Sequence, residues 1–352
     1  MKIGLLIYGS LETLSGGYLY DRKLVEYLRA QGDRVEIISL PWRNYAAHLV
    51  DNLNFRLPPD LDILIQDELN HPSLIGANAG LHPYPIVSLV HHLRCSELRP
   101  AWQNLFYRVF EKRYLRSVDA FIFNSQTTRG VVRSLAGDTL PALVAYPPTD
   151  RFGEPLSAAF VAARAGEAGR LRLVFLGNLI PRKGLDTLLE ALSLQPEICL
   201  DVIGSPLSDP VYAEQMRRKA AQPGLAGRVC FLGALDNAAL AEKLKSAQLL
   251  VVPSSYEGFG IVYLEGMGFG LPAIGTLAGA ASEIITDGLN GYLIRPGDAG
   301  VLAERLGALC ADRELLTRLS LAALERYNRQ PTWQQTAGSI RQFLQEQTHL
   351  SV

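Results

Sequence analysis

Two glutamates, eight positions apart, bracket a glycine-rich loop in the second half of the chain. Glu257 and Glu265 lie in the segment PSSYEGFGIVYLEGMGFGLP, which spans residues 253–272. An apolar run at 249–252 predicts a buried strand before the loop, and the apolar residues after Gly260 predict a short buried helix. Unpaired N–H groups in the first turn of such a helix attract anions, whereas carboxylates accept hydrogen bonds from sugar hydroxyls. This pattern therefore predicts a ligand that is part phosphate and part sugar.

A basic turn near the start of the same half is a second candidate anion site. Arg182 and Lys183 come shortly after the apolar run 171–177 and directly before Gly184, where a helical pattern begins. Adjacent cations at a strand-to-helix turn favour phosphate groups. The alternative is a pair of charges that only face solvent.

The glutamate segment resembles the donor site of family 4 of the glycosyltransferases, which are retaining enzymes with the GT-B fold. The resemblance implies that Glu257 contacts the hydroxyls of the donor sugar and that Glu265 binds the ribose hydroxyls. It also implies that Arg182 and Lys183 bind the diphosphate. One departure is the sequence Glu-Gly-Met-Gly at 265–268, where the family often has Glu-Ala-Met-Ala. Another is Asn178, which stands where the family often has an arginine.

The same resemblance assigns donor contacts to backbone groups of the second half. The loop at Gly258, Phe259, Gly260 and Ile261 is expected to approach the sugar and the phosphate. Residues near Gly204 and Leu235, which follow two further strand-like runs, are expected to contact the base through the backbone.

Three further candidates lie in the first half of the chain. Gly16 and Gly17 end a loop that follows the strand predicted at 3–8, and the resemblance implies that this glycine pair approaches the donor diphosphate. A flexible loop is the alternative. The resemblance also implies that a histidine directly after the strand predicted at 86–90 lies near the reacting sugar. Alignment by strand favours His91, and His92 is the alternative.

The length and composition suit two domains. A chain of 352 residues, 48% of them hydrophobic, is too long for a single compact core. The resemblance implies an α/β protein of the GT-B type, with two Rossmann-like domains facing a cleft. Residues 1–150 would form the acceptor-side domain, 151–170 a linker and 171–330 the donor-binding domain. A C-terminal helix, at about 333–352, would cross back to the first domain.

Several classes of protein are disfavoured. A net charge of −1 argues against a nucleic-acid partner. Asp60 and Asp62 form an Asp-x-Asp pattern, but it introduces a predicted strand, so we expect no metal and no cofactor other than the nucleotide sugar as co-substrate. Four cysteines without a Cys-x-x-Cys pair, no signal peptide and no apolar run near ~18 residues predict a cytoplasmic protein.

The segment 100–117 predicts a helix with aromatic and basic residues. The aromatic positions are Trp102, Phe106 and Phe110, and the basic ones are Arg108, Lys112, Arg113 and Arg116. We expect the aromatic stripe to pack on the sheet and the basic side to face solvent. The alternative is peripheral contact with the inner membrane surface, which would suit a lipid-linked acceptor.

Together these features predict a retaining, metal-independent hexosyltransferase. It would move a hexose from a UDP- or GDP-linked sugar to a saccharide, a lipid-linked saccharide or a small-molecule acceptor. Two alternatives stay open. A nucleotide-sugar 2-epimerase of the same fold would convert the donor without an acceptor, and a non-catalytic nucleotide-sugar binder would release no nucleotide.

Overall fold

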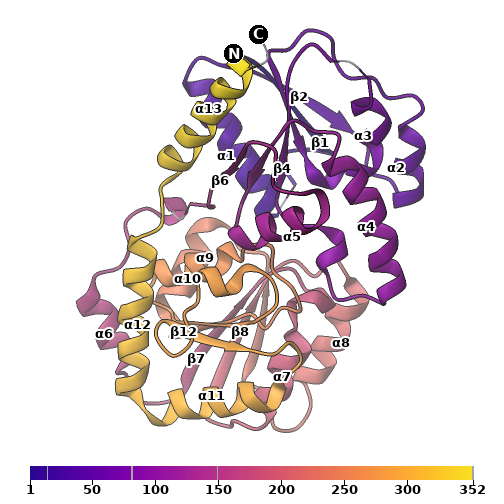
Figure 1. The fold of residues 1–352 in the computed structure, drawn as a ribbon. Helices are drawn as coiled ribbons and strands as arrows, with labels where there is room; N and C mark the ends of the chain where they lie inside the picture. The colour runs from indigo at the N-terminus through magenta and orange to yellow at the C-terminus, as the bar shows by residue number, and fades with distance from the viewer. Residues whose placement is uncertain (14, 81, 149, 351–352) are drawn as a thin grey trace. The chain divides into compact units, whose positions relative to one another are not determined.

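The computed structural model describes residues 1–13, 15–80, 82–148 and 150–350, and it divides into two compact units (Figure 1). The first unit comprises residues 1–148 and 331–352, and the second comprises residues 149–330. Each unit is built on its own parallel sheet, so the fold class is α/β. None of the helices in the described ranges is long and apolar enough to cross a membrane.

The sheet of the first unit has six strands in the order β2-β1-β3-β4-β5-β6, and all neighbours are parallel. Its strands are β1 (Lys2–Tyr8), β2 (Arg34–Leu40), β3 (Ile63–Asp67), β4 (Ile86–Val90), β5 (Ala120–Phe123) and β6 (Ala142–Val144). The helices between them are α1 (Gly16–Ala30), α2 (Tyr45–Asp51), α3 (His71–Asn78), α4 (Ala101–Leu115) and α5 (Gln126–Ala136). Because the strands are parallel, their carboxyl ends meet at one edge, which is where α/β sheets bind ligands.

The last helix, α13 (Trp333–Leu350), belongs to the first unit and lies beside α1 (Figure 1). Its residues Ala337, Ile340 and Leu344 are buried in the core that includes β1 and α1. The Arg341 guanidinium donates to Asp33 at 2.7 Å. The predicted C-terminal helix therefore completes the first unit, although its last two predicted residues, 351–352, lie outside the described residues.

The sheet of the second unit also has six parallel strands, in the order β12-β11-β10-β7-β8-β9. Its strands are β7 (Leu171–Leu176), β8 (Ile198–Ile203), β9 (Val229–Gly233), β10 (Leu249–Val251), β11 (Ala273–Thr276) and β12 (Gly291–Ile294). Its helices are α6 (Ala158–Ala165), α7 (Leu185–Ser193), α8 (Pro210–Ala220), α9 (Asn237–Ser246), α10 (Ile261–Gly268), α11 (Ala299–Ala311) and α12 (Arg313–Asn328).

The segment predicted as a linker, 151–170, differs from that expectation because it is part of the second unit. Helix α6 buries Val161 and Ala165 completely. The buried Arg164 guanidinium donates to the carbonyl of Gly270 at 3.0 Å, and Gln248 donates back to the Arg164 carbonyl at 2.8 Å. Alanine-rich composition suggested a linker, but here it allows close helix packing. Thr149, at the predicted boundary, lies outside the described residues.

Helix α4 corrects a second expectation. Trp102 is 70% exposed and Phe106 is 45% exposed, so the aromatic stripe does not pack on the sheet. The helix instead turns Glu111, Tyr114 and Leu115 inward. Buried Glu111 accepts a hydrogen bond from the backbone N–H of Arg94 at 2.6 Å, which fixes this orientation.

Candidate functional site

The two predicted anion-site segments meet in the second unit. Strands β7 and β10 are neighbours, so the turn after β7 and the loop after β10 emerge side by side. The Lys183 ammonium, in the first segment, donates to Glu257 Oε1 at 2.5 Å in the second. Ser254 Oγ donates to the same oxygen at 2.6 Å. The structure thus joins two candidates that are 74 residues apart in sequence.

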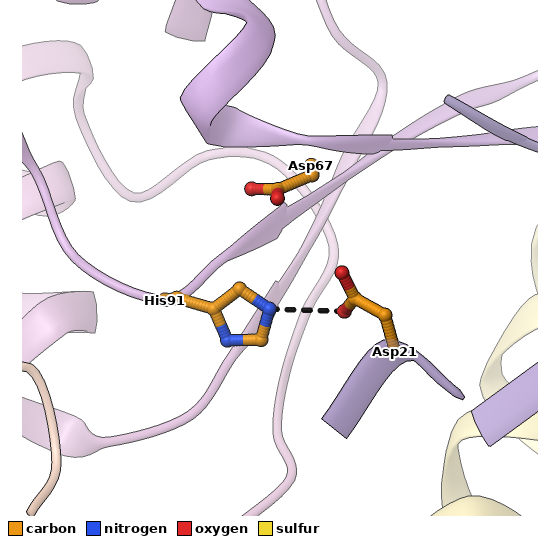
Figure 2. A group of neighbouring side chains, drawn as sticks. All are labelled: Asp21, Asp67 and His91. Carbon is orange, nitrogen blue, oxygen red and sulfur yellow. Dashed lines mark hydrogen bonds and ion pairs between the residues drawn. The ribbon is translucent and has the colours of Figure 1, made fainter. Parts of the chain in front are cut away.

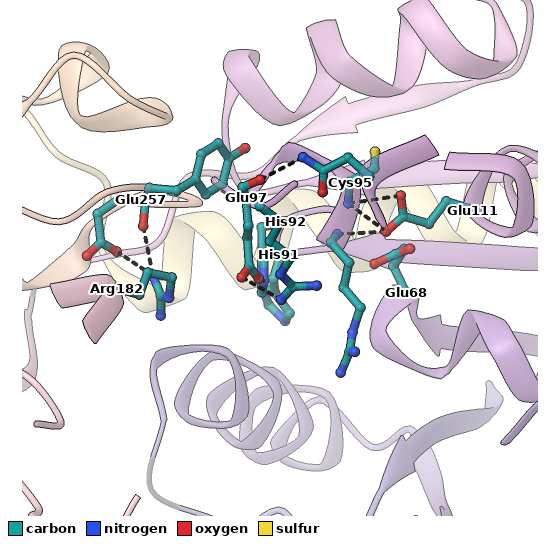
Figure 3. A network of polar contacts seen from close by, with 12 residues as sticks. Glu68, His91, His92, Cys95, Glu97, Glu111, Arg182 and Glu257 are labelled. Atoms are coloured by element: carbon teal, nitrogen blue, oxygen red, sulfur yellow. Dashed lines mark hydrogen bonds and ion pairs between the residues drawn. The ribbon is translucent and has the colours of Figure 1, made fainter. Parts of the chain in front are cut away.

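Arg182 lies on the other oxygen of the same carboxylate (Figure 3). Its guanidinium is 3.9 Å from Glu257 Oε2 and donates to the Tyr256 carbonyl at 2.7 Å. Burial raises the pKa of Glu257, but the charges of Lys183 and Arg182 and the hydrogen bonds from Lys183 and Ser254 outweigh it. The net pKa lies below its ordinary value, so Glu257 is a carboxylate at neutral pH.

Two glycines are required by the geometry of these turns. Gly184 has φ of +69°, and a Cβ atom there would collide with the carbonyl oxygen of Pro253. Gly260, which precedes α10, has φ of +90°, and a Cβ atom there would lie 2.6 Å from the ring of Tyr263. The hydroxyl of Tyr263 donates to the Val252 carbonyl at 2.7 Å, so this ring cannot easily move aside. The glycines let the loop fold tightly against the start of α10.

Glu265 lies on α10 and is paired with a residue that the sequence did not single out. Arg151 donates to Glu265 Oε1 at 2.6 Å and to Asn237 Oδ1 at 2.7 Å. Burial raises the pKa of Glu265, and the charge and hydrogen bond of Arg151 offset this only in part. No motif could have revealed Arg151, because its partner is 114 residues away.

The remaining donor-site candidates of the second unit lie in the loops after neighbouring strands. Gly204 follows β8, and its N–H donates to the Gly233 carbonyl at the end of β9 at 2.8 Å. Leu235 is half-buried shortly after β9. In the loop before α10, Phe259 is buried, while Gly258 and the first helical residue, Ile261, are half-buried.

In the first unit, the structure brings Gly17 and His91 together. Gly16 and Gly17 begin α1, and His91 follows β4. A Cβ atom on Gly17 would lie 3.3 Å from the His91 ring, so a side chain there would crowd the histidine. His91 Nε2 is 3.0 Å from Oδ1 of Asp21, a fully buried residue of α1 (Figure 2). Asp21 was not predicted from the sequence, although its place one helical turn after Gly17 was a usable signal.

Three carboxylates raise the pKa of His91. Burial lowers the pKa of His91, but the charge and hydrogen bond of Asp21, with the charges of Asp67 and Glu68, raise it to about 9. Burial and the charge of Asp21 raise the pKa of Asp67 to about 7, against the opposing charge of His91. Asp21 Oδ2 is buried with no hydrogen-bond partner among the described residues. His91 is therefore an imidazolium at neutral pH.

His92, the alternative to His91, lies in a different environment. Its Nε2 is 3.2 Å from Glu97 Oε1, and Arg99 donates to Glu97 Oε2 at 2.7 Å. His92 is thus part of a half-exposed charge cluster, while His91 packs against the glycine pair.

Two groups of side chains in the described part of the chain have the composition of metal ligands. They are Asp21, Asp67 and His91, and Glu68, His71 and Glu111. In the second group, burial lowers the pKa of His71 to about 4, and Glu111 holds backbone N–H groups near Cys95 (Figure 3). Both acids of the Asp-x-Asp pattern contact Lys2 at the start of β1. The Lys2 ammonium donates to Asp60, and the Lys2 backbone N–H donates to Asp62.

Comparisons with known proteins bear on the fold and on the family. Residues 163–326 match the family model described as glycosyl transferases group 1. The chain is 26% identical to the phosphatidyl-myo-inositol mannosyltransferase of Mycobacterium leprae over 97% of this chain and 95% of that protein. Among solved structures, the sucrose-phosphate synthase of Thermosynechococcus elongatus superposes with a TM-score of 0.80 at 20% identity, covering 98% of both chains. Anabaena Alr3699/HepE in complex with UDP-glucose gives 0.76 at 20% identity, covering 98% of this chain and 100% of that one.

The matched family segment contains Arg182, Lys183, Glu257 and Glu265. The two likenesses to solved structures extend over both units and establish the two-domain GT-B fold. The fold is GT-B, and the family match, which covers residues 163–326, supports a glycosyltransferase of group 1.

Proposed function

We propose that this chain is a retaining, metal-independent hexosyltransferase that uses a UDP- or GDP-linked sugar. The acceptor would be a saccharide, a lipid-linked saccharide or a small molecule, and the reaction would take place in the cytoplasm. Two relatives point the same way: one is named a phosphatidyl-myo-inositol mannosyltransferase, and another was solved with UDP-glucose.

The observation that carries the proposal is the contact of Lys183 and Arg182 with Glu257. It places two cations and a carboxylate within one loop cluster at the start of α10. An isolated buried carboxylate would be costly in free energy. Glu257 is ionised because Lys183, Arg182 and Ser254 stabilise its charge. Such a cluster offers cations to a diphosphate and a fixed acceptor to sugar hydroxyls.

In the proposed reaction, cleavage of the bond between sugar and phosphate develops negative charge on the diphosphate. Arg182, Lys183 and the N–H groups at the start of α10 would stabilise that charge, which is electrostatic catalysis by fixed groups. The acceptor would attack from the face that the phosphate leaves, and the leaving phosphate would take the acceptor's proton. Glu265 would bind the ribose, so nucleotide binding would compete with its ion pair to Arg151.

The first unit's roles in this proposal rest on resemblance. Gly16 and Gly17 would approach the diphosphate through the backbone. His91, an imidazolium at neutral pH, would donate a hydrogen bond to a sugar hydroxyl or to the leaving group.

A thermal-shift panel of nucleotides and nucleotide sugars, with a chelator present, tests the proposal. A ligand at 100 times its dissociation constant stabilises a protein by about 2.7 kcal/mol, which is readily measured. We expect a selective shift with one UDP- or GDP-linked sugar. Glu265→Ala should lose most of the shift with the free nucleotide, whereas Glu257→Ala should keep it and lose transfer activity.

The controls and contrary outcomes are distinct. Glu304→Ala, at an exposed position of α11 in the same unit, should leave the shift unchanged. The opposite behaviour of the two site variants would overturn the assignment of the acids. Conversion of the donor to a new nucleotide sugar without an acceptor would instead establish an epimerase. A donor shift that appears only when the panel is repeated without chelator would overturn the metal-free clamp.

A further inference from the structure

Helix α4 presents large apolar side chains to solvent. Trp102, Leu105 and Val109 each expose more than half of their surface, and Phe106 is also exposed. Their spacing of three, four and seven positions from Trp102 puts them on one side of the helix. Leu98, just before the helix, is 67% exposed as well. Soluble proteins rarely gather so many large apolar residues on a surface without a partner.

The same side of the helix continues as a basic surface. Lys112, Arg113 and Arg116 follow the apolar residues by further helical turns, and all three are exposed. Arg108 is exposed at the border. Within the described ranges, none of these four basic side chains forms an ion pair or hydrogen bond with another residue. The single acid of the helix, Glu111, points inward and is fully buried.

Apolar and basic residues are therefore separated along the helix axis and not between its two sides. We call this surface the α4 face; it comprises Leu98, Trp102, Leu105, Phe106, Arg108, Val109, Lys112, Arg113 and Arg116. From Trp102 to Arg116 it extends for about 20 Å at 1.5 Å per residue. A helix lying flat on a surface could thus use all of it at once.

We propose that the α4 face docks on a membrane surface that contains anionic lipid. The apolar half would enter the boundary between headgroups and acyl chains, where tryptophan is favoured. The basic half would lie against lipid phosphates, and its lack of partner acids leaves it free to do so. This inference does not depend on which nucleotide sugar the second unit binds.

The charge pattern favours a lipid surface over bulk solvent or a second copy of this chain. A helix that only faces solvent would account for the basic half but would leave the apolar half unfavourably exposed. A second copy of this chain would bring the same cations to the contact without any acid of this face to meet them. An anionic membrane satisfies both halves with a single surface.

Vesicle flotation tests the inference with the full chain. One set of vesicles contains phosphatidylcholine alone, and the other an equimolar mixture of phosphatidylcholine and phosphatidylglycerol. We expect binding to the mixed vesicles that weakens as salt is raised. Arg113→Gln with Arg116→Gln should lower partitioning by about 30-fold, because each basic side chain near an anionic surface contributes roughly fivefold. Trp102→Ser with Leu105→Ser should lower it at least as much.

A matched control uses equally exposed apolar residues elsewhere. Leu207 and Val211 are exposed in the second unit, and Leu207→Ser with Val211→Ser should leave partitioning unchanged. All variants should keep the wild-type melting temperature and the shift with donor nucleotide, which separates this test from that of the proposed function. Absence of binding to mixed vesicles, or binding that survives both α4 variants, would overturn the proposal. So would a concentration-dependent dimer, measured by sedimentation without lipid, that the Trp102 variant abolishes.

Discussion

Asp21 acts on His91 through a single contact between two side chains. The carboxylate is fully buried on α1, and His91 Nε2 is its partner at 3.0 Å. Asp67 and Glu68 add further negative charge near the ring. A histidine that would normally lose its proton near pH 6.5 therefore keeps it well into the alkaline range. If His91 works at the donor sugar, Asp21 is a positioning residue for it.

Asp21→Asn should lower the pKa of His91 and change how stability depends on pH. A raised pKa contributes stability that is present below pH 6.5 and is lost as the pH rises through about 9. The same change should lower the pKa of Asp67, because it removes a neighbouring negative charge. The raised pKa of Asp67 in the wild type likewise contributes stability that is lost as the pH rises through about 7. The variant should therefore lose less stability than the wild type as the pH rises from 6.5 to about 9.

The measurements are an NMR titration of the histidine rings and denaturant unfolding at the two ends of this pH range. Glu97→Gln is the control, because it removes the partner of His92 and should leave His91 unaffected. An unchanged His91 midpoint in Asp21→Asn would show that burial, and not this carboxylate, governs the ring.

At the scale of elements, strand patterns and helix starts could be predicted from local sequence. The apolar run before Glu257 is β10, and the helix expected after Gly260 is α10. The side on which α4 packs could not be predicted, because it depends on Glu111 reaching backbone N–H groups near Arg94. The Arg151–Glu265 pair could not be predicted either, since only the folded unit brings these two segments together.

The turn before α7 depends on Gly184, which makes a sharp test of this element. Gly184→Ala should destabilise the second unit by on the order of 3 kcal/mol or more, because the new Cβ would strike the Pro253 carbonyl as well as strain the backbone. The displaced turn carries Lys183, so binding of the donor nucleotide should weaken too.

Gly227→Ala is the matched control. Gly227 has φ of +75°, close to that of Gly184, but a Cβ atom added there would have no other atom within 4 Å among the described residues. Backbone strain alone should cost about 1–2 kcal/mol there and leave nucleotide binding intact. Denaturant unfolding and the thermal shift measure both quantities. Equal losses of unfolding free energy in the two variants would show that the close contact with Pro253 does not contribute to the effect.

For the whole molecule, the two units differ in how the chain builds them. The second is one continuous segment, 149–330, whereas the first is made from both ends of the chain. Without α13, the core of the first unit would expose the surfaces that Ile340, Phe343 and Leu344 cover. Burying one such side chain contributes about 1.5–3 kcal/mol to stability. Losing all three contributions would therefore remove much of the roughly 5–15 kcal/mol by which a folded domain is stable.

Residues 149–330 expressed alone should therefore fold cooperatively, and residues 1–148 alone should not. Calorimetry of the two fragments measures this, with the full chain as the reference. The isolated second unit should also retain a thermal shift with free nucleotide that Glu265→Ala removes. A cooperative transition in the 1–148 fragment would contradict the role given to α13.

The return of α13 to the first unit has a consequence for the order of events on the ribosome. The first unit emerges before the second, yet its core lacks Ala337, Ile340 and Leu344 until residues 149–330 have all been synthesised. The second unit emerges whole and can fold as soon as its own segment is free. The core of the first unit therefore stays incomplete, with part of α1 uncovered, while the entire second unit is synthesised. Chaperones that shield apolar surface would meet this protein at that stage, and slowing translation would lengthen their encounter.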